Sequence, residues 1–195
     1  MRGRRGLRER DVSERQEKSC REHAGRHHGL SYIDMTVTPI GTVHSPVREA
    51  IDDVWGGVHC RIELDASRFT PESLAGLEEF SHVEIVFVFD RVTDSEIHCA
   101  SRHPRGRTDW PKVGIFAQRA KNRPNRIGVT VCRLVSVEGL ALMVEGFDAI
   151  DGTPVLDIKP HMREFEPRGL VRQPSWATEL MSKYWDPPAS ATQSR

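Results

Sequence analysis

The chain has 195 residues, of which 37% are hydrophobic and 29% charged, and its 28 basic and 28 acidic side chains leave no net charge. This length suits one domain with short appendages, and no apolar run approaches the roughly 20 residues that a membrane-spanning helix needs. The four cysteines are scattered without a CxxC pair. That spacing argues against a structural zinc site and a disulfide framework, and it indicates a reducing, cytoplasmic setting.

The balanced total hides a local excess of positive charge. Residues 102–126 hold eight Lys or Arg side chains against one acid, Asp109. A patch confined to one segment favours an anionic ligand or a specific nucleic-acid contact over a general attraction to DNA.

Residues 1–34 are rich in charge, have few apolar side chains and show no periodicity. This composition predicts disorder. Their six acids and the lack of an apolar stretch argue against a transit or signal peptide. Organised sequence begins abruptly at Met35, so our hypothesis is that Met35 is the natural start.

The structured part opens with strand signals. Residues 37–44 predict a strand that ends at a Ser-Pro pair, and residues 58–64 alternate between apolar and polar side chains, which predicts a half-buried strand. Proline after Thr70 predicts the start of a short helix that contains Leu74, Leu77 and Phe80. Residues 82–89 are almost continuously apolar, which predicts a strand buried on both faces.

A long loop over 90–111 follows, and the remaining pattern is again mostly β. The glycine within 137–140 predicts a tight hairpin, and apolar spacing over 175–185 predicts a helix before a polar tail at 186–195. Further strands are predicted at 112–117, 127–137, 140–147 and 155–158.

Six or seven strands with two short helices do not build a doubly wound α/β sheet. They predict an all-β fold, mainly an antiparallel β-barrel, with short peripheral helices and a C-terminal helix. The expected organisation is a disordered extension at 1–34, a barrel domain at 35–172, and a helix with its tail at 173–195.

Several common site motifs are missing. The chain has no GxGxxG after a strand, no GxxxxGK[ST] and no GxSxG, so dinucleotide, P-loop and that type of hydrolase chemistry have no support. The nine histidines lack HxxxH and HExxH spacing. His98, Cys99 and His103 share one loop, but ordinary surface or core histidines are the simpler interpretation, and we expect no metal.

Residues 116–128, FAQRAKNRPNRIG, place four cations within eight residues. Pro124 restricts the backbone, whereas Asn125 and Gly128 tolerate unusual dihedral angles. A rigid loop of guanidinium groups is suited to a carboxylate or phosphate. The alternative is a solvated loop.

Residues 148–160, DAIDGTPVLDIKP, set Asp148, Asp151 and Asp157 among turn residues, with Lys159 at the exit. The segment predicts a tight turn, and a plain β-hairpin turn is the alternative. Such a turn can also receive an amine, a ribose or a cation.

The segment 49–57, EAIDDVWGG, is a third unusual loop. Its two neighbouring acids and Trp55 are suited to hydrogen-bond and stack on a purine nucleoside. The alternative is a plain connection between strands.

Together these strings resemble the TsaA-like (TrmO) family, the S-adenosylmethionine-dependent tRNA methyltransferases that act on N6-threonylcarbamoyladenosine beside the anticodon. The resemblance covers residues 35–160. It is carried by PIGTVHSP (39–46), LEEFSHVEIVFVF (77–89), HPRGR (103–107), VGIFAQRAKNRPNRIG (113–128) and DAIDGTPVLDIKP (148–160).

The resemblance implies a small β-barrel methyltransferase that works as a homodimer on the anticodon arm of tRNA. Two positions depart from the family: residues 52–55 read DDVW where many relatives have a PRQ-type loop, and Arg126 replaces a proline common after RPN. The S-adenosylmethionine-binding residues that it implies are Asp52, Asp53, Val54, Trp55, Arg91, Arg119, Lys121, Arg123, Asp151, Gly152, Thr153 and Pro154.

The reaction that the family implies needs a urea-like nitrogen in line with a sulfonium methyl group, which makes orientation and polarisation the tasks of the protein. We expect Asp151 to hold the cofactor and Arg119 or Arg123 to grip a carboxylate. Asn125 would orient the urea and Lys159 would neutralise charge. Salt-sensitive phosphate contacts are expected from Arg102, Arg105 and Arg107.

Two other functions stay open at this point. One is a non-catalytic barrel that binds RNA or a nucleotide, and the other is a methyltransferase for a small molecule. Some relatives carry a larger domain after the DIKP segment, whereas 35 residues follow Pro160 here.

Overall fold

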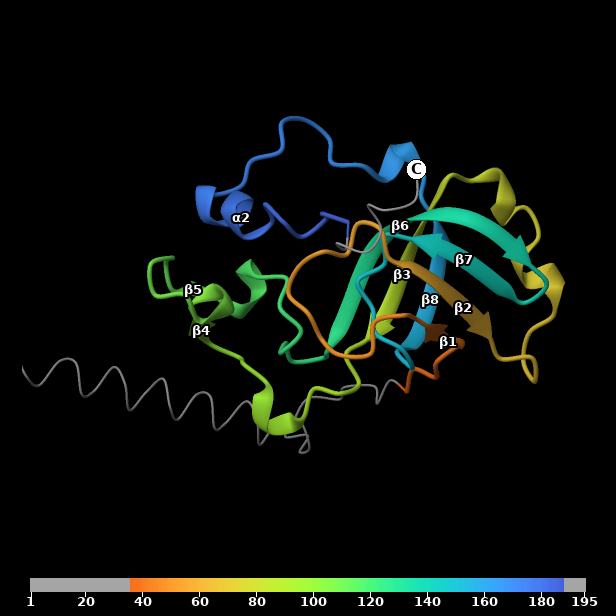
Figure 1. The fold of residues 1–195 in the computed structure, drawn as a ribbon, viewed down its shortest axis with the longest axis horizontal. Coiled ribbons are helices and arrows are strands. Elements are labelled where there is room, and N and C mark those ends of the chain that lie inside the picture. Colours follow the sequence, from red (N-terminus) through yellow and green to blue (C-terminus); the bar gives the residue numbers. More distant parts are fainter. Residues whose placement is uncertain (1–35, 188–195) are drawn as a thin grey trace, which may run out of the picture. The chain divides into compact units, whose positions relative to one another are not determined.

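The computed structural model describes residues 36–187. The predicted extension at 1–34, the proposed start at Met35 and the end of the tail lie outside these residues. Contacts divide the chain into two compact units, both drawn in Figure 1. We call Val37–Val88 with the chain from Gly128 onward the barrel unit, and Phe89–Ile127 the insertion unit.

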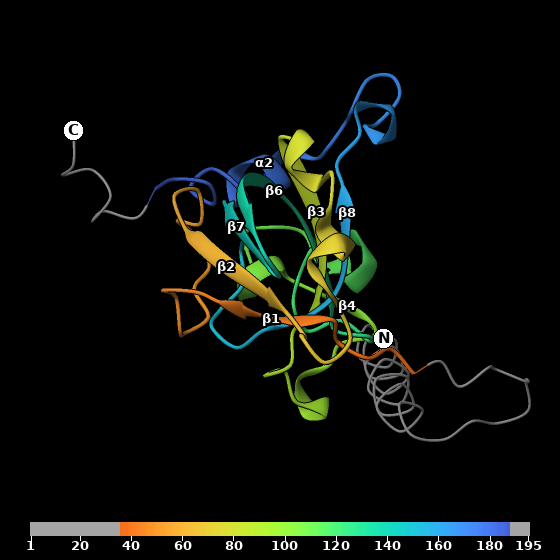
Figure 2. The ribbon, with the colours of Figure 1, turned by 90° about the vertical axis from the view of Figure 1, so that its right-hand side faces the viewer.

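The barrel unit is a closed barrel with the strand order β1-β2-β7-β6-β3-β8, visible around the ring in Figure 2. Strand pairs such as β1 with β2 and β3 with β8 are antiparallel. The predicted all-β barrel is therefore confirmed. Its strands are β1 Gly41–His44, β2 His59–Leu64, β3 His82–Val88, β6 Ile127–Glu138, β7 Ala141–Glu145 and β8 Pro154–Pro160.

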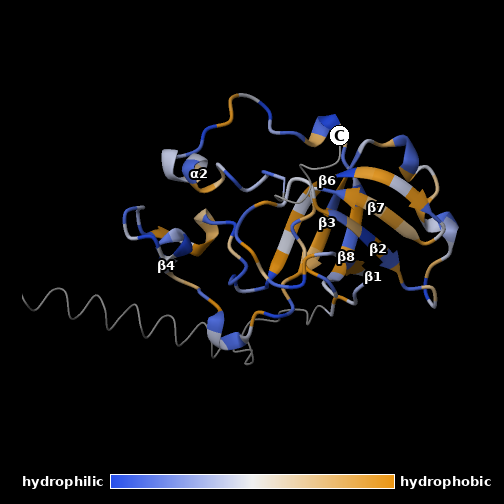
Figure 3. Ribbon diagram, in the orientation of Figure 1, coloured by the Kyte–Doolittle hydropathy of each residue, from blue (hydrophilic) through white to orange (hydrophobic). Residues whose placement is uncertain are grey.

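Alternating side chains fill the barrel. Cys60, Ile62 and Leu64 of β2 are buried while the residues between them are exposed, as the sequence pattern predicts. The prediction that 82–89 is buried on both faces is wrong, because every second residue of β3 is only half-buried. A strand of a closed barrel has one face turned outward, however apolar it is. Figure 3 shows these apolar barrel strands.

Gly128 is needed for space rather than for an unusual dihedral angle. A Cβ at this position would lie 2.4 Å from Cζ of Phe87, whose ring packs edge-on against Phe147 at 5.2 Å between centroids. The left-handed backbone occurs two residues earlier, at Arg126, with φ of 53°. The sequence-based explanation of Gly128 was therefore wrong.

The helices are shorter than predicted. Residues 71–80 form two 3₁₀ turns, η1 Pro71–Leu74 and η2 Leu77–Glu79, because Gly76 between them has φ of 84°. The C-terminal helix α2 covers Ser175–Leu180 and gives way to turns. After it, the backbone pairs with a loop of the barrel unit.

The insertion unit contains little regular structure, as predicted for 90–111. Its two-stranded sheet joins β4 Ser101–Arg102 to β5 Val113–Gly114, so the strand expected over 112–117 is mostly replaced by a 3₁₀ turn, η5 Ile115–Ala117. The other turns are η3 Asp94–Glu96, held by a capping box from Thr93, and η4 Pro104–Gly106. The backbone N–H of Phe89 donates to the carbonyl of Arg126 at 2.8 Å. This hydrogen bond connects the beginning of the insertion unit to its end.

Cys60 and Cys132 are free and buried, and burial raises the pKa of both thiols. Within residues 36–187, no helix is long and apolar enough to cross a membrane.

Candidate functional site

The exit of β1 and the DGTP turn meet at the barrel, although they are 106 positions apart in the chain. The backbone N–H of Ser45 donates to Oδ1 of Asp151 at 3.1 Å, and those of Asp151 and Gly152 donate to the carbonyls of Val47 and Val43 at 2.8 Å each. The turn is not a hairpin, because β7 and β8 are not neighbours in the barrel. Gly152 has φ of 85°, which only glycine adopts easily.

Both carboxylate oxygens of Asp148 accept hydrogen bonds from side-chain hydroxyls. Its Oδ1 accepts a short hydrogen bond from the hydroxyl of Thr130, and its Oδ2 accepts one from the hydroxyl of Tyr184 at 2.5 Å. The sequence drew attention to Asp148 because of its charge. It did not predict the hydrogen bond to Tyr184, which was noted only as part of the predicted C-terminal helix. Both were missed as candidate site residues.

The loop at 52–55 is held by the chain after α2. The N–H groups of Val54 and Trp55 donate to the carbonyls of Lys183 and Tyr184 at 3.1 and 2.8 Å. Val54 has φ of 68°, a strained conformation for a β-branched residue that is typical of functional loops. Asp52 is exposed and Asp53 half-buried.

Trp55 does not offer an open face for stacking, because only 3% of it is exposed. The expectation that its ring stacks on a purine from solvent is therefore corrected. Its indole N–H is buried, and no partner for it exists within residues 36–187. An unpaired buried donor costs about 1–3 kcal/mol, so this atom suits an acceptor supplied by a ligand.

Lys159 and Asp151 are not brought together. Lys159 is five residues along β8 from Pro154, a distance of about 16 Å at the rise of a strand, and Asp151 precedes that strand. The ammonium of Lys159 bonds Oδ2 of Asp157 at 2.5 Å, and this contact raises the pKa of Lys159. The charge that Lys159 neutralises is that of its neighbour Asp157.

The basic loop of the insertion unit is braced by two of its own arginines. Nη1 of Arg123 donates to the carbonyl of Gln118 at 3.2 Å. Arg126 donates to the carbonyl of Val92 at 2.8 Å and forms an ion pair with Asp94. Arg126 therefore holds the loop in place. Among the other predicted residues, Arg91, Arg119, Lys121 and Asn125 are exposed.

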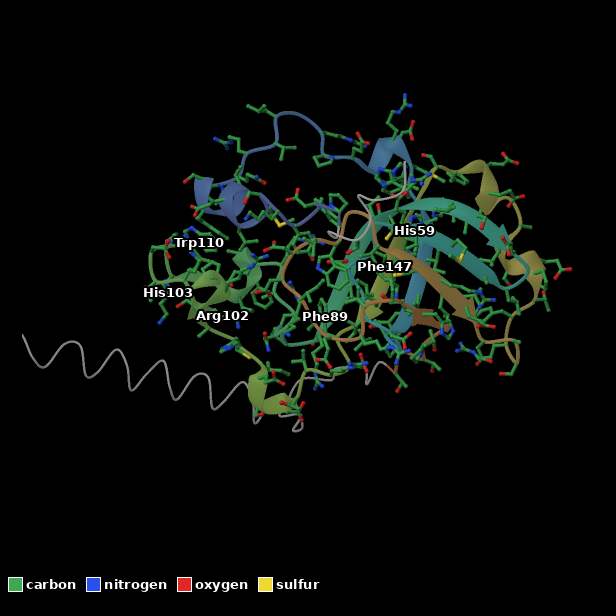
Figure 4. All side chains as sticks on the ribbon, viewed as in Figure 1. His59, Phe89, Arg102, His103, Trp110 and Phe147 are labelled. Carbon is green, nitrogen blue, oxygen red and sulfur yellow. The ribbon has the colours of Figure 1, made fainter. Side chains whose placement is uncertain are left out.

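The segment that contains Arg102, His103 and Trp110 folds on itself, as Figure 4 shows. Nδ1 of His103 lies 2.7 Å from the carbonyl oxygen of Trp110, and the guanidinium of Arg107 covers the Trp110 ring at 3.9 Å. Arg107 also bonds Asp109 and lowers the pKa of that carboxyl. No group of three potential metal ligands exists in the part of the chain that the structure describes.

The family model for the tRNA-methyltransferase O N-terminal domain matches residues 51–167. The chain belongs to this family. The match includes the 52–55 loop, the whole insertion unit and the DGTP turn. They contain the three segments of this TrmO-family chain that the sequence singled out as candidates.

Individual relatives agree. A probable S-adenosyl-L-methionine-binding protein of Pyrococcus abyssi is 38% identical over 143 residues, which are 69% of this chain and 72% of that protein. The tRNA (adenine(37)-N6)-methyltransferase of Homo sapiens is 44% identical over 102 residues, 52% of this chain. The chain spans only 23% of the human protein's length.

The fold is shared with solved structures. A crystal structure of TrmO from Pseudomonas aeruginosa superimposes with a TM-score of 0.61 at 30% identity, over 83% of this chain and 66% of that one. A second TrmO structure from the same organism gives a TM-score of 0.57 at 32% identity, over 72% and 62%.

Proposed function

We propose that this protein is an S-adenosylmethionine-dependent methyltransferase that methylates the N6 nitrogen of N6-threonylcarbamoyladenosine next to the anticodon of tRNA. The observation that carries the proposal is the DGTP turn of a TrmO-family barrel, bonded to the exit of β1 through Asp151. The methyltransferase domain is residues 35–172. Because the proposed substrate is tRNA, we expect the protein to act in the cytoplasm.

The barrel unit fits the adenosyl and amino groups of the cofactor. Asp52 is an exposed carboxylate that can accept hydrogen bonds from ribose hydroxyls or an ammonium. The unpaired indole N–H of Trp55 can donate to a ring nitrogen or a ribose oxygen. Asp151 accepts a hydrogen bond from the Ser45 N–H, and its carboxylate charge suits a cationic group. We assign the turn Asp151, Gly152, Thr153 and Pro154 and the loop Asp52, Asp53, Val54 and Trp55 to cofactor binding.

The insertion unit carries exposed positive charge. Arg119 and Lys121 are exposed cations on a loop braced by Arg123. They are suited to the carboxylates of the cofactor and of the threonyl group, because guanidinium binds carboxylate through two parallel bonds. Arg91 is assigned to the same set.

S-adenosylmethionine, when bound, supplies an electrophilic methyl group. The residues of the chain then have to orient an acceptor nitrogen whose lone pair is delocalised into a urea. Asn125, which is exposed, can hold the urea by its amide, and Arg119 or Arg123 can polarise the urea carbonyl or grip the threonyl carboxylate. Asp151 holds the cofactor. Lys159, paired to Asp157 away from Asp151, is left out of this set.

The protein is also proposed to act as a homodimer. Every second residue of β6 faces outward, and Val129, Val131 and Val135 are 40, 44 and 44% exposed. Val129 and Val131 are neighbours on this outward face and form an apolar strip that a second copy would cover, whereas Arg133, which pairs with Glu145, separates them from Val135.

Transfer of labelled methyl groups to bulk tRNA tests the proposal, with calorimetric titration of S-adenosylmethionine beside it. Label in tRNA together with cofactor binding supports it. Cofactor binding without label in tRNA would indicate a small-molecule acceptor. RNA binding without cofactor binding would indicate the non-catalytic barrel.

A further inference from the structure

Phe116 is an exposed aromatic side chain in an otherwise basic region. It is 78% exposed, whereas Phe87 and Phe147 of the barrel unit are 1% and 0% exposed. A single exposed apolar side chain is common and means little alone. Two further observations make Phe116 notable: Ile115 and Gln118 on either side of it are buried, and the charged residues near it in sequence are cations.

The turn that carries Phe116 is fixed on either side. Ile115 is 1% exposed, and its N–H donates to the carbonyl of Ala100 at 3.0 Å. Gln118 is 8% exposed, and its side-chain amide donates to the carbonyls of Arg102 and Val113 at 3.2 and 3.0 Å. With both flanking residues held inward, Phe116 is kept outward, and little ordering is left for a ligand to impose on the backbone.

The charge around this turn is positive. Lys112, Arg119 and Lys121 are exposed within five residues of Phe116, in a segment with eight cations and one acid. Phe165 is 79% exposed, much like Phe116, but its sequence neighbours Glu164 and Glu166 are acidic.

We propose that Phe116 is a stacking platform for an unpaired base of the RNA substrate, with the neighbouring cations holding the adjoining phosphates. This inference rests on the proposed function and names a residue that binds its RNA. Aromatic faces among Lys and Arg are how proteins hold single-stranded nucleic acid, since every base has a face that stacks.

A protein partner fits this surface less well. Protein interfaces have apolar centres depleted of charge. Among the described residues of the insertion unit, the exposed large apolar side chains are Phe116 and Ile127, the latter 40% exposed. The exposed charged residues near Phe116 in sequence are Lys112, Arg119 and Lys121, all of them cations.

The test uses the full chain and an anticodon stem–loop RNA that carries fluorescent 2-aminopurine in its loop. Phe116→Ala is expected to weaken binding about 5- to 150-fold, the usual loss for one stacked base, and to abolish the quenching of 2-aminopurine. Phe116→Trp should restore both, because a larger ring still stacks. Phe165→Ala, the control at a similarly exposed position, should leave both unchanged.

Two further readouts separate this role from others. S-adenosylmethionine affinity and the sedimentation coefficient should not change in Phe116→Ala. Unchanged RNA binding by Phe116→Ala, or no RNA binding by the unmodified protein, would overturn the platform. Loss of cofactor affinity would assign the ring to the cofactor instead, and loss of self-association would assign it to a protein interface.

The outcome is independent of catalysis. If the protein binds the RNA through Phe116 and transfers no methyl group, the platform stands and the proposed function fails. If methyl transfer occurs and Phe116→Ala methylates dilute RNA at the full rate, the platform fails and the proposed function stands.

Discussion

The hydroxyl of Tyr184 donates a hydrogen bond of 2.5 Å to Oδ2 of Asp148. This bond joins the segment after α2 to the start of the DAIDGTP motif. The same segment accepts backbone hydrogen bonds from Val54 and Trp55. The residues after α2 therefore shape two parts of the candidate cofactor site, although the sequence predicts only a terminal helix there.

Tyr184→Phe removes this bond and keeps the ring. Because the acceptor is a carboxylate and the pair is half-buried, we expect the free energy of unfolding to fall by about 1–2 kcal/mol. Urea denaturation measures the change. Ser182→Ala, which removes an exposed hydroxyl nearby, is the control and should stay within about 0.5 kcal/mol of the original protein. Equal stability of Tyr184→Phe would mean that the bond is not formed in solution.

Gly128→Ala places a methyl group against the ring of Phe87, with 2.4 Å between Cβ and Cζ. The ring is fully buried and cannot move freely, so overpacking should lower the free energy of unfolding by about 1–3 kcal/mol. Gly114→Ala is the matched control, since a Cβ there meets nothing within 4 Å. If both variants unfold at the same urea concentration, the packing around Gly128 is looser than described.

Arg119→Ala is expected to lower kcat/KM for methyl transfer about 10- to 150-fold, which corresponds to the loss of one charge-assisted contact of about 1.5–3 kcal/mol. Arg119 is exposed, so the stability of the fold should not change. Arg172→Ala removes another exposed arginine, outside the candidate site, and should keep full activity. Full activity of Arg119→Ala would remove this residue from the proposed site.

Val131→Glu puts a charge into the apolar strip of β6, where Val131 is 44% exposed. Because a buried unpaired carboxylate is costly, we expect the dimer to dissociate, which analytical ultracentrifugation detects. Val37→Glu, at an apolar residue of similar exposure (54%) outside β6, is the control. A dimer that survives Val131→Glu would place the interface elsewhere.

The barrel could be predicted because its signals are local. Alternation in residues 59–64 gives one buried and one exposed face, and such a period of two depends only on neighbouring residues. The glycine of the 137–140 link likewise predicted the β6–β7 pair, whose connection has Gly139 at φ of 61°. Rigidity of the basic loop followed from Pro124 and agrees with the bracing by Arg123.

The errors concern relations that only the tertiary fold decides. Trp55 next to two acids suggested an exposed ring, but the segment after α2 pairs with its backbone and only 3% of the residue stays exposed. The charge-neutralising role of Lys159 stays a prediction, and the carboxylate that it contacts in the structure is that of Asp157. Neither the burial of Trp55 nor the partner of Lys159 can be predicted from a local sequence pattern.

Nucleoside mass spectrometry of the methylated tRNA tests the central claim most directly. The account predicts a methylated form of N6-threonylcarbamoyladenosine after incubation with S-adenosylmethionine, and no methylated product from tRNA that lacks the threonylcarbamoyl group. Methyl groups found on another nucleoside, or transferred equally to tRNA without that modification, would contradict it.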